Sequence, residues 1–442
     1  MKKYFLSVII ILALGACRKS ANDPVPTPPT SQNAPPKISY PSQLTLTVGK
    51  HIAIGPVNRG GEVPATLYGQ VTTFAGSTVR ASGYVNAIGT AAEFNSPQQL
   101  TGDNQGNLYI ADTYNNAIRK ITPDGTVTTF AGSLTGLTGN KDAADTSALF
   151  NYPDGLAIDP TGNFFVSDYS NNAIRKITPA GVVSTFYKAT ALFGPGGICF
   201  DNSGNLIITA QDANQVVKVS PAGVLTIIAG SLADTGGYVN GTGTSAVFYT
   251  PTDVKTDTAG NMYVVDLENS AIRKITPAGV VTTFSGTQPG PDARDGNPYL
   301  FRSPAGIAIG AGGVMYVADL GTSQVQRIMP DGTVSLVAGS VTGLYGDADG
   351  LGSAASFFEP AYIYIDNTGT AYVSDIVNFN IRKIVLTGYT YQGDKLPPGL
   401  TFDAKTGTIS GTPTAQSATI HCTITGFNIK GFSASNIAIE VK

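Results

Sequence analysis

The sequence predicts an all-β protein whose largest part is a six-bladed β-propeller. A segment of similar sequence recurs six times, each copy opens with a proline, and each full copy holds four short apolar runs between Gly- and Pro-containing turns. Repeats longer than about 40 residues with this composition are typical of propeller blades. The copies open at Pro97, Pro153, Pro195, Pro251, Pro304 and Pro360, so the period lies between 42 and 56 residues.

The second copy shows how one blade is built. Its apolar runs cover 156–159, 164–168, 174–178 and 182–186, and they are rich in β-branched and aromatic residues. Turns with Pro and Gly connect the first run to the second and the third to the fourth. Four antiparallel strands of this kind form one twisted sheet, which buries its apolar faces only by stacking against other sheets around an axis.

The sixth copy lacks its fourth run, and this absence predicts how the ring closes. The copy that opens at Pro360 ends near Gly388 without a VTTF strand, whereas a VTTFAGS segment stands at 71–77, ahead of the first full copy. Pairing this early strand with the last copy completes six blades and removes an exposed sheet edge. We therefore expect Thr72 and Thr73 to pair alongside residues 381–384.

On these repeats the chain resembles NHL-repeat β-propellers. The motifs that carry the resemblance are the YIAD, FVSD, YVVD, YVAD and YVSD runs, followed in most copies by Asn-x-x-Ile-Arg-Lys-Ile. The resemblance covers about 320 residues and implies the propeller fold. It implies no single activity, because such propellers include lyases, scaffolds and ligand-binding proteins.

The two ends of the chain, 38–66 and 388–442, do not repeat. The segment 396–415, LPPGLTFDAKTGTISGTPTA, resembles the haemagglutinin-type immunoglobulin-like (Ig-like) domain of bacteria. That resemblance implies two earlier strands, and matching pieces stand far upstream, at 44–61. We therefore expect a six-bladed β-propeller (71–387) inserted into an Ig-like β-sandwich, because an insert with adjacent termini disturbs its host least. The alternative is two unrelated flanking segments.

The first 17 residues have the pattern of a lipoprotein signal. A basic start precedes an apolar core and the sequence Leu14-Gly-Ala-Cys17, which predicts lipidation of Cys17 and a membrane anchor. Residues 18–37 are rich in proline and predict an extended tether. We expect an outer-membrane lipoprotein, facing the periplasm or the cell surface; the alternative is a plain signal peptide.

Composition narrows the possible partners. The net charge of −3 and the 13% of charged residues argue against a nucleic-acid partner. We expect a monomer with no bound cofactor, apart from a possible calcium ion.

An Asp and an Arg seven residues later recur in four copies, as Asp112/Arg119, Asp168/Arg175, Asp266/Arg273 and Asp375/Arg382. The third copy replaces both at once, with Ala210 and Val217. Joint replacement is expected of an ion pair, because either charge left alone in a buried site is costly. We interpret these residues, and the recurring Phe94, Phe150, Phe248, Phe301 and Phe357, as structural.

Candidate ligand-binding residues lie where the copies differ. The two positions after each opening proline should line the mouth of the propeller channel, and they supply Gln98, Gln99, Asp154, Asp253 and Tyr362. Asp154 and Asp253 are weak candidates for a calcium site, since two carboxylates fall short of six oxygen ligands.

Tyr114 and Tyr169 precede the third strand of their blades, on the face that carries the longer loops. Exposed tyrosine suits sugar rings or protein surfaces. The alternative is that these loop tyrosines only cap their own blade.

Catalytic residues are poorly supported. Both histidines, His51 and His421, fall in the segments expected to form the sandwich, so no histidine is available in the propeller. We expect a non-catalytic binding or scaffold protein for a glycan or a protein ligand. The alternative is a calcium-dependent hydrolase or lyase with a metal site at the channel mouth.

Overall fold

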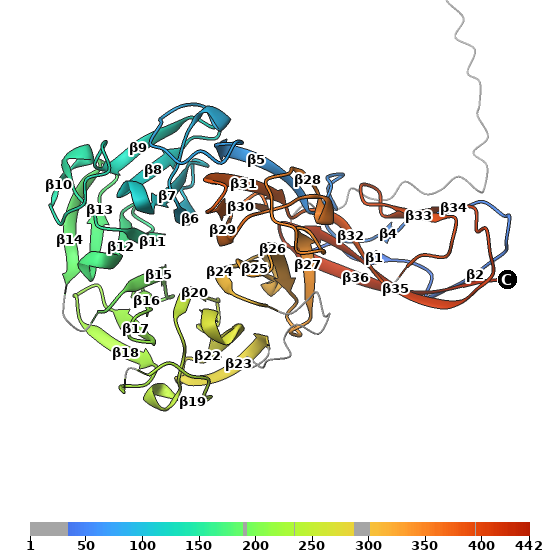
Figure 1. The fold of residues 1–442 in the computed structure, drawn as a ribbon. Coiled ribbons are helices and arrows are strands. Elements are labelled where there is room, and N and C mark those ends of the chain that lie inside the picture. Colours follow the sequence, from blue (N-terminus) through green and yellow to red (C-terminus); the bar gives the residue numbers. More distant parts are fainter. Residues whose placement is uncertain (1–33, 189–191, 234, 287–300, 394) are drawn as a thin grey trace, which may run out of the picture.

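The computed structural model describes residues 34–188, 192–233, 235–286, 301–393 and 395–442. These residues form nine β-sheets and contain no α-helix. Six sheets stand around a common axis as the blades of a propeller, and the other three form a sandwich beside the ring (Figure 1). The predicted six-bladed propeller is confirmed.

Each blade has four antiparallel strands, with the first strand nearest the axis (Figure 1). Blade 1 consists of β6 (Pro97–Gly102), β7 (Leu108–Asp112), β8 (Ala117–Ile121) and β9 (Val127–Gly132). Blade 2 consists of β11 (Pro153–Ile158), β12 (Phe164–Asp168), β13 (Ala173–Ile177) and β14 (Val182–Lys188). Blade 3 consists of β15 (Pro195–Phe200), β16 (Leu206–Ala210), β17 (Gln215–Val219) and β18 (Leu225–Ala229).

Blade 4 consists of β20 (Pro251–Thr256), β21 (Met262–Asp266), β22 (Ala271–Ile275) and β23 (Val280–Gly286). Blade 5 consists of β24 (Pro304–Ile309), β25 (Met315–Asp319), β26 (Gln324–Ile328) and β27 (Val334–Ala338). Blade 6 consists of β29 (Pro360–Ile365), β30 (Thr370–Asp375), β31 (Asn380–Val385) and β5 (Gln70–Gly76). The two-residue strands β10 (Ala143–Ala144), β19 (Gly241–Thr242) and β28 (Gly350–Leu351) extend blades 2, 4 and 6 at their outer edges.

The ring closes as the sequence predicts. Strand β5 pairs antiparallel with β31, with Thr72 opposite Lys383 and Thr73 opposite Arg382. Two segments more than 300 residues apart therefore share one sheet. This pairing covers the outer edge of β31, which would otherwise be open to association with another chain.

The recurring Asp and Arg side chains are buried ion pairs, as predicted. The N–O distances are 2.7, 2.8, 2.7 and 3.1 Å in blades 1, 2, 4 and 6. The two residues are diagonal neighbours rather than directly opposite, because Asp112 pairs with Ala117 while Arg119 pairs with Ile110. Arg119 also donates to the carbonyls of Val85 and Glu93, so the pair holds the preceding loop against the blade.

The recurring phenylalanines fill the space between neighbouring blades. Phe150 is fully buried in a cluster that joins Ala111 and Ile118 of blade 1 to Leu156 and Val166 of blade 2. This contact supports the structural interpretation of the phenylalanines.

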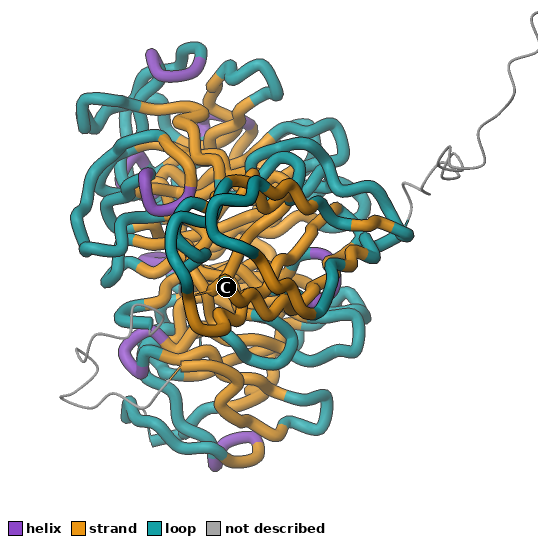
Figure 2. Tube along the Cα trace, turned by 90° about the vertical axis from the view of Figure 1, so that its right-hand side faces the viewer, coloured by secondary structure: helices purple, strands orange, loops and turns teal. Residues whose placement is uncertain are grey.

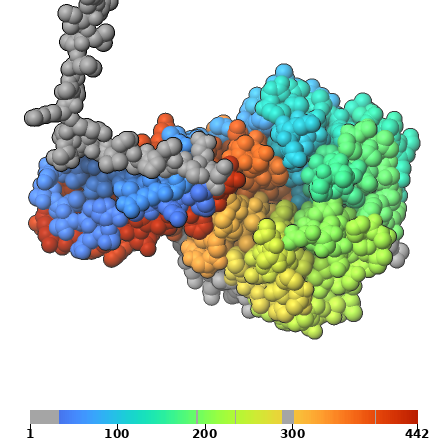
Figure 3. All heavy atoms as spheres, turned by 180° about the vertical axis from the view of Figure 1, so that it is seen from behind, coloured from blue at the N-terminus to red at the C-terminus, as the bar shows by residue number. Residues whose placement is uncertain are grey.

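Both ends of the chain build the sandwich. Strand β2 (Gln43–Leu46) runs parallel to β36 (Gly431–Val441), and β3 (Ile52–Ile54) runs antiparallel to β34 (Thr408–Gly411). The remaining strands are β1 (Ile38–Ser39), β4 (Val57–Asn58), β32 (Gly388–Gly393), β33 (Leu400–Asp403) and β35 (Ser417–Asn428). Figure 3 shows this domain as adjoining blue and red atoms beside the ring. The propeller is thus inserted into the Ig-like sandwich.

The sandwich packs against the outer side of blades 5 and 6, and Figure 2 shows it in front of the ring, which is seen edge-on. Tyr68 stacks on Phe427 with ring centroids 4.8 Å apart. The guanidinium of Arg327, from blade 5, lies 5.3 Å from the first ring and 5.0 Å from the second. Such cation–π contacts attach the two domains to each other.

The predicted signal peptide, its Cys17 and residues 18–33 of the tether lie outside the described residues. Within the described part of the chain, no helix is long and apolar enough to cross a membrane.

Candidate ligand-binding site

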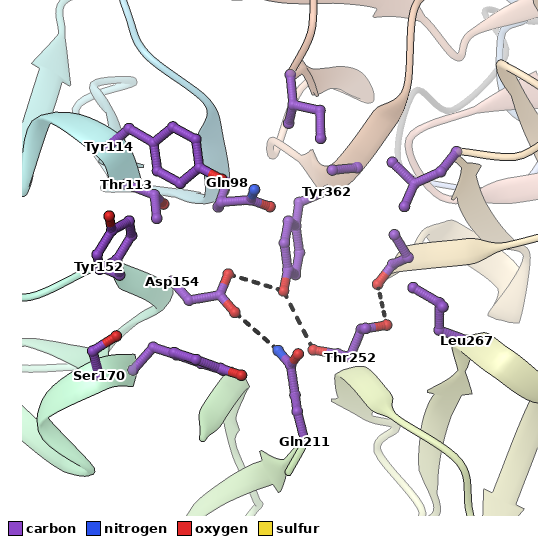
Figure 4. A pocket seen from close by; sticks show the side chains of 15 residues that line it. Gln98, Thr113, Tyr114, Tyr152, Asp154, Ser170, Gln211, Thr252, Leu267 and Tyr362 are labelled. Carbon is purple, nitrogen blue, oxygen red and sulfur yellow. Dashed lines mark hydrogen bonds between the residues drawn. The ribbon is translucent and has the colours of Figure 1, made fainter. Parts of the chain in front are cut away.

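A cavity of about 420 Å³ lies at the axis, on the face that carries the loops between the second and third strands of each blade. We call it the mouth pocket (Figure 4). Its lining residues are Gln98, Thr113, Tyr114, Tyr152, Asp154, Tyr169, Ser170, Gln211, Thr252, Leu267, Ala305, Leu320, Ala361, Tyr362 and Ile376. All six blades contribute to it.

Two structural positions of the repeat supply most of this lining. The first is the residue after the opening proline, which the sequence predicted, and it places Gln98, Asp154, Thr252, Ala305 and Ala361 in the pocket. The second is the residue that follows the second strand, and it places Thr113, Tyr169, Gln211, Leu267, Leu320 and Ile376 there.

Apart from Tyr169, the residues of this second set were not predicted from the sequence. The signal was present, because the residue before it is Asp in five copies whereas this residue changes its chemistry from copy to copy.

Asp154 is the carboxylate of the pocket, and it is only partly accessible. Its Oδ1 accepts a hydrogen bond of 3.1 Å from the Tyr362 hydroxyl, and its Oδ2 accepts one of 2.9 Å from Gln211 Nε2 (Figure 4). Burial raises the pKa of Asp154 to about 7, against the effect of these two hydrogen bonds, and the nearby Asp253 adds to the rise. Burial also raises the pKa of Tyr362 well above its ordinary value, so this phenol stays protonated and donates.

Gly196 explains how Gln211 reaches Asp154. Gly196 occupies the same position in blade 3 that Asp154 occupies in blade 2. A Cβ atom on Gly196 would lie 2.0 Å from Gln211 Nε2, which is shorter than any allowed contact. The missing side chain therefore leaves the space in which Gln211 crosses to the neighbouring blade.

Of the three site residues predicted at the second position after the proline, only Tyr362 lines the mouth pocket. Gln99 and Asp253 do not line the mouth pocket; they lie deeper on the axis, where Gln99 Nε2 donates to Asp253 Oδ1 over 3.3 Å. One residue along a strand is a step of about 3.3 Å toward the interior, which takes these side chains below the mouth. They connect blade 1 to blade 4 across the axis, and Gly197 gives Asp253 room because a Cβ there would contact it at 2.6 Å.

The two candidate calcium ligands, Asp154 and Asp253, are bound by different partners. Asp253 is completely buried, and its Oδ1 is 2.6 Å from Lys255 Nζ. Its Oδ2 accepts the backbone N–H of Ile307 at 3.0 Å. Within the described residues no group of three or more His, Cys, Asp or Glu side chains is arranged to hold a metal ion. The calcium hypothesis needed both carboxylates, and one of them is already neutralised by a lysine.

Three tyrosines form the rim of the pocket on the side of blades 1 and 2. Tyr114 and Tyr152 pack edge to face with ring centroids 5.4 Å apart, and they are 57% and 41% exposed. Tyr169 donates a 2.7 Å hydrogen bond to Asp212 of blade 3. Tyr114 and Tyr169 thus line the cavity, and whether they bind a ligand there stays a prediction.

Both histidines lie in the sandwich, away from the mouth pocket. His51 precedes β3 and its Nδ1 is 3.4 Å from Thr412 Oγ1, while His421 belongs to β35. The chemistry available at the mouth is therefore that of one carboxylate, amides, hydroxyls and phenols.

Comparison with known protein families supports the assignment of both domains. Residues 150–177 match the NHL repeat, and residues 355–442 match the family described as Putative Ig domain (He_PIG). The second match begins inside blade 6, whereas the C-terminal strands of the sandwich begin at Gly388. The upstream strands that complete this domain are separated from it by the propeller.

NHL repeat-containing protein 2 of Homo sapiens is 37% identical over 99 residues, which are 22% of this chain and 13% of that protein. The chain spans about a tenth of the length of the curated relatives it matches. A structural genomics protein of unknown function from Bacteroides thetaiotaomicron has a TM-score of 0.57 at 16% identity and covers 80% of this chain and 99% of its own. An auxiliary nutrient binding protein from the same organism has a TM-score of 0.54 at 15% identity, covering 80% and 98%.

The closed ring defines the class of protein as a six-bladed β-propeller, and blade 2 of this ring matches the NHL repeat. This particular chain combines that propeller with an Ig-like domain made from its two ends.

Proposed function

We propose that the protein is a non-catalytic lipoprotein of the bacterial outer membrane that binds a glycan or a protein ligand at the looped face of its propeller. The observation that carries this proposal is the mouth pocket, whose lining comes from the positions at which the six blades differ. Residues that repeat in the ring hold it together, so a site specific for one ligand has to use the residues that do not repeat.

Two further observations support a binding role. The pocket has the volume of small-ligand sites and combines aromatic rims with a few polar groups, as such sites do. A solved structure with the same fold is named an auxiliary nutrient binding protein, and a similar role here is part of the proposal.

The test is binding of the purified protein to a glycan array and to immobilised envelope proteins. We expect Tyr114→Ala and Tyr169→Ala to weaken the captured ligand at least tenfold. Tyr249→Ala is the matched control, since Tyr249 is 47% exposed but does not line the pocket. Equal loss in all three variants, or no loss in any, would contradict a site at the mouth.

The anchor is tested separately. Cys17→Ala should abolish incorporation of radiolabelled palmitate and release the protein from the membrane fraction, if Cys17 carries lipid as proposed. Retention of label in this variant would place the lipid elsewhere.

A further inference from the structure

The two halves of the mouth pocket differ in chemistry. At the position after the second strand, blades 1 to 3 supply Thr113, Tyr169 and Gln211, whereas blades 4 to 6 supply Leu267, Leu320 and Ile376. The position after the opening proline follows the same division, with Gln98 and Asp154 on one side and Ala305 and Ala361 on the other. Thr252 and Tyr362 are the polar exceptions in blades 4 to 6. One wall of the pocket is therefore polar, and the opposite wall is largely aliphatic.

Asp154 has no cationic partner among the described residues. Five of the six buried aspartates of the ring are paired with Arg or Lys at 2.6 to 3.1 Å, as in Asp168 with Arg175 and Asp253 with Lys255. Asp319 accepts backbone N–H groups instead, from Arg302, Ser303 and Gly321. Asp154 is bonded only to a neutral phenol and a neutral amide, so its charge is uncompensated.

The hydrogen bonds of Asp154 leave it able to accept more. A carboxylate has about four lone-pair positions, and Tyr362 and Gln211 occupy one on each oxygen. Tyr114 and Tyr152 stand at the rim on the same side, and the faces of such rings attract cations. The polar wall thus presents negative potential from a carboxylate and from aromatic rings, and the described lining contains no Lys or Arg.

We propose that the mouth pocket binds a protonated amine attached to an apolar group, with the ammonium on Asp154 and the apolar group against Leu267, Leu320 and Ile376. This inference rests on the proposed binding function and specifies its ligand chemistry. The ammonium supplies the positive charge that Asp154 lacks, and the aliphatic wall removes an apolar body from water.

Other ligand classes fit the pocket less well. A neutral sugar would turn hydroxyl groups toward three aliphatic side chains that offer them no hydrogen bonds. An anion would be repelled by Asp154. A divalent cation would find one carboxylate where six oxygen ligands are needed.

The test uses 2-phenylethylamine, with 2-phenylethanol as the neutral and 3-phenylpropionate as the anionic probe, in isothermal titration calorimetry with the full chain. We expect the amine to bind at least tenfold more tightly than the alcohol, and the propionate not to bind. Asp154→Asn should abolish the preference for the amine, and so should Asp154→Thr, which places the blade-4 residue in blade 2. Asp331→Asn is the charge-matched control on an exposed turn of the opposite face, and it should leave the preference unchanged.

The pH dependence gives an independent readout. Because the pKa of Asp154 is about 7, protonation competes with the amine, and affinity should be about tenfold weaker at pH 6 than at pH 8. Tyr362 and Tyr169 face Asp154 as neutral phenols over this range. Burial raises the pKa of Asp253 as well, against the effect of Lys255, so the Asp154→Asn variant is needed to separate the two carboxylates. In Asp154→Asn the affinity should not change with pH.

Two sources of the amine are distinguished by a second pair of probes. The peptide Phe-Gly-Gly-amide and its N-acetylated form test a peptide N-terminus, and 2-phenylethylamine tests a small free amine. Binding of either amine, with loss on acetylation or in Asp154→Asn, supports the inference. Equal binding of amine and alcohol, or binding of neither, overturns it. If a glycan or protein is captured through Tyr114 and Tyr169 while the amines fail, the proposed function stands and the amine specificity falls.

Discussion

Two sets of carboxylates in this propeller have opposite roles. Asp112, Asp168, Asp266 and Asp375 occur at the same place in their blades, and each is paired with an arginine. Asp154 occurs in one blade only, lies at the mouth of the axis and has no cationic partner among the residues that the structure describes. The difference teaches that repetition marks the groups that hold the ring, while departure from the repeat marks the groups that face a ligand.

Removing one partner of a repeated Asp–Arg ion pair should have the largest effect on the free energy of unfolding. Arg175→Ala leaves the buried Asp168 without its partner, and the free energy of unfolding should fall by about 3–5 kcal/mol. The double change Asp168→Ala with Arg175→Val, which copies blade 3, should recover a large part of this loss. Chemical denaturation of the three proteins measures the difference. If the double variant is no more stable than the single one, the pair is not the reason for the joint replacement.

The closing strand gives a second comparison. Val71 in β5 and Val127 in β9 occupy the same place in blades 6 and 1, and they are 0% and 1% exposed. Val71→Ala and Val127→Ala should each lower the free energy of unfolding by about 2–3 kcal/mol, since each leaves a buried cavity. A much smaller loss at Val71 would show that β5 is held loosely and that closure is weak.

Asp154→Asn should raise the free energy of unfolding, whereas the variants above lower it. Burial raises the pKa of Asp154 from 3.8 to about 7, so the folded state binds more protons than the unfolded state between these values and loses stability as the pH rises through them. Removing the charge should therefore stabilise the protein by about 1–2 kcal/mol at pH 8 and have little effect below about pH 4. Calorimetric melting of both proteins across this pH range checks the sign. Destabilisation at pH 8 would place Asp154 with the structural carboxylates.

Tyr114→Ala should have the smallest effect on stability. The side chain is 57% exposed and its ring contact is with Tyr152, so the free energy of unfolding should change by less than about 0.5 kcal/mol. Binding of 2-phenylethylamine should nevertheless weaken, because one aromatic ring of the rim is lost. A large loss of stability would support the interpretation that this tyrosine only caps its own blade.

Most of the fold could be predicted from the sequence, because the motifs that indicate it recur at regular intervals along the chain. The missing strand of the sixth copy predicted that Thr72 and Thr73 pair with β31, and they do. The joint loss of Asp and Arg in the third copy predicted the ion pairs, whereas their diagonal placement across the hairpin is known only from the strand register of the structure. The upstream strands of the sandwich were found because their motif stands alone before the first repeat.

Only part of the mouth pocket could be predicted from the sequence. Gln98 and Asp154 were expected at the mouth from their place after the proline, and they line it. Gln99 and Asp253 were expected there too, but they lie deeper and bond to each other. Leu267, Leu320 and Ile376 were not singled out, since an isolated aliphatic residue after a strand looks like ordinary core. Their alignment on one wall appears only when six blades are placed around one axis.

The amino-acid sequence by itself determined the number of blades, the closing strand and the residues that tie each blade, because these follow from local periodicity repeated along the chain. The tertiary structure alone decided that residues about 57 to 208 positions apart, Gln211 and Tyr362 with Asp154, meet in one pocket with a polar and an aliphatic wall. The physical reason is that closure of a ring brings the same position of every blade to the axis, where its chemistry depends on five neighbours that are remote in the chain.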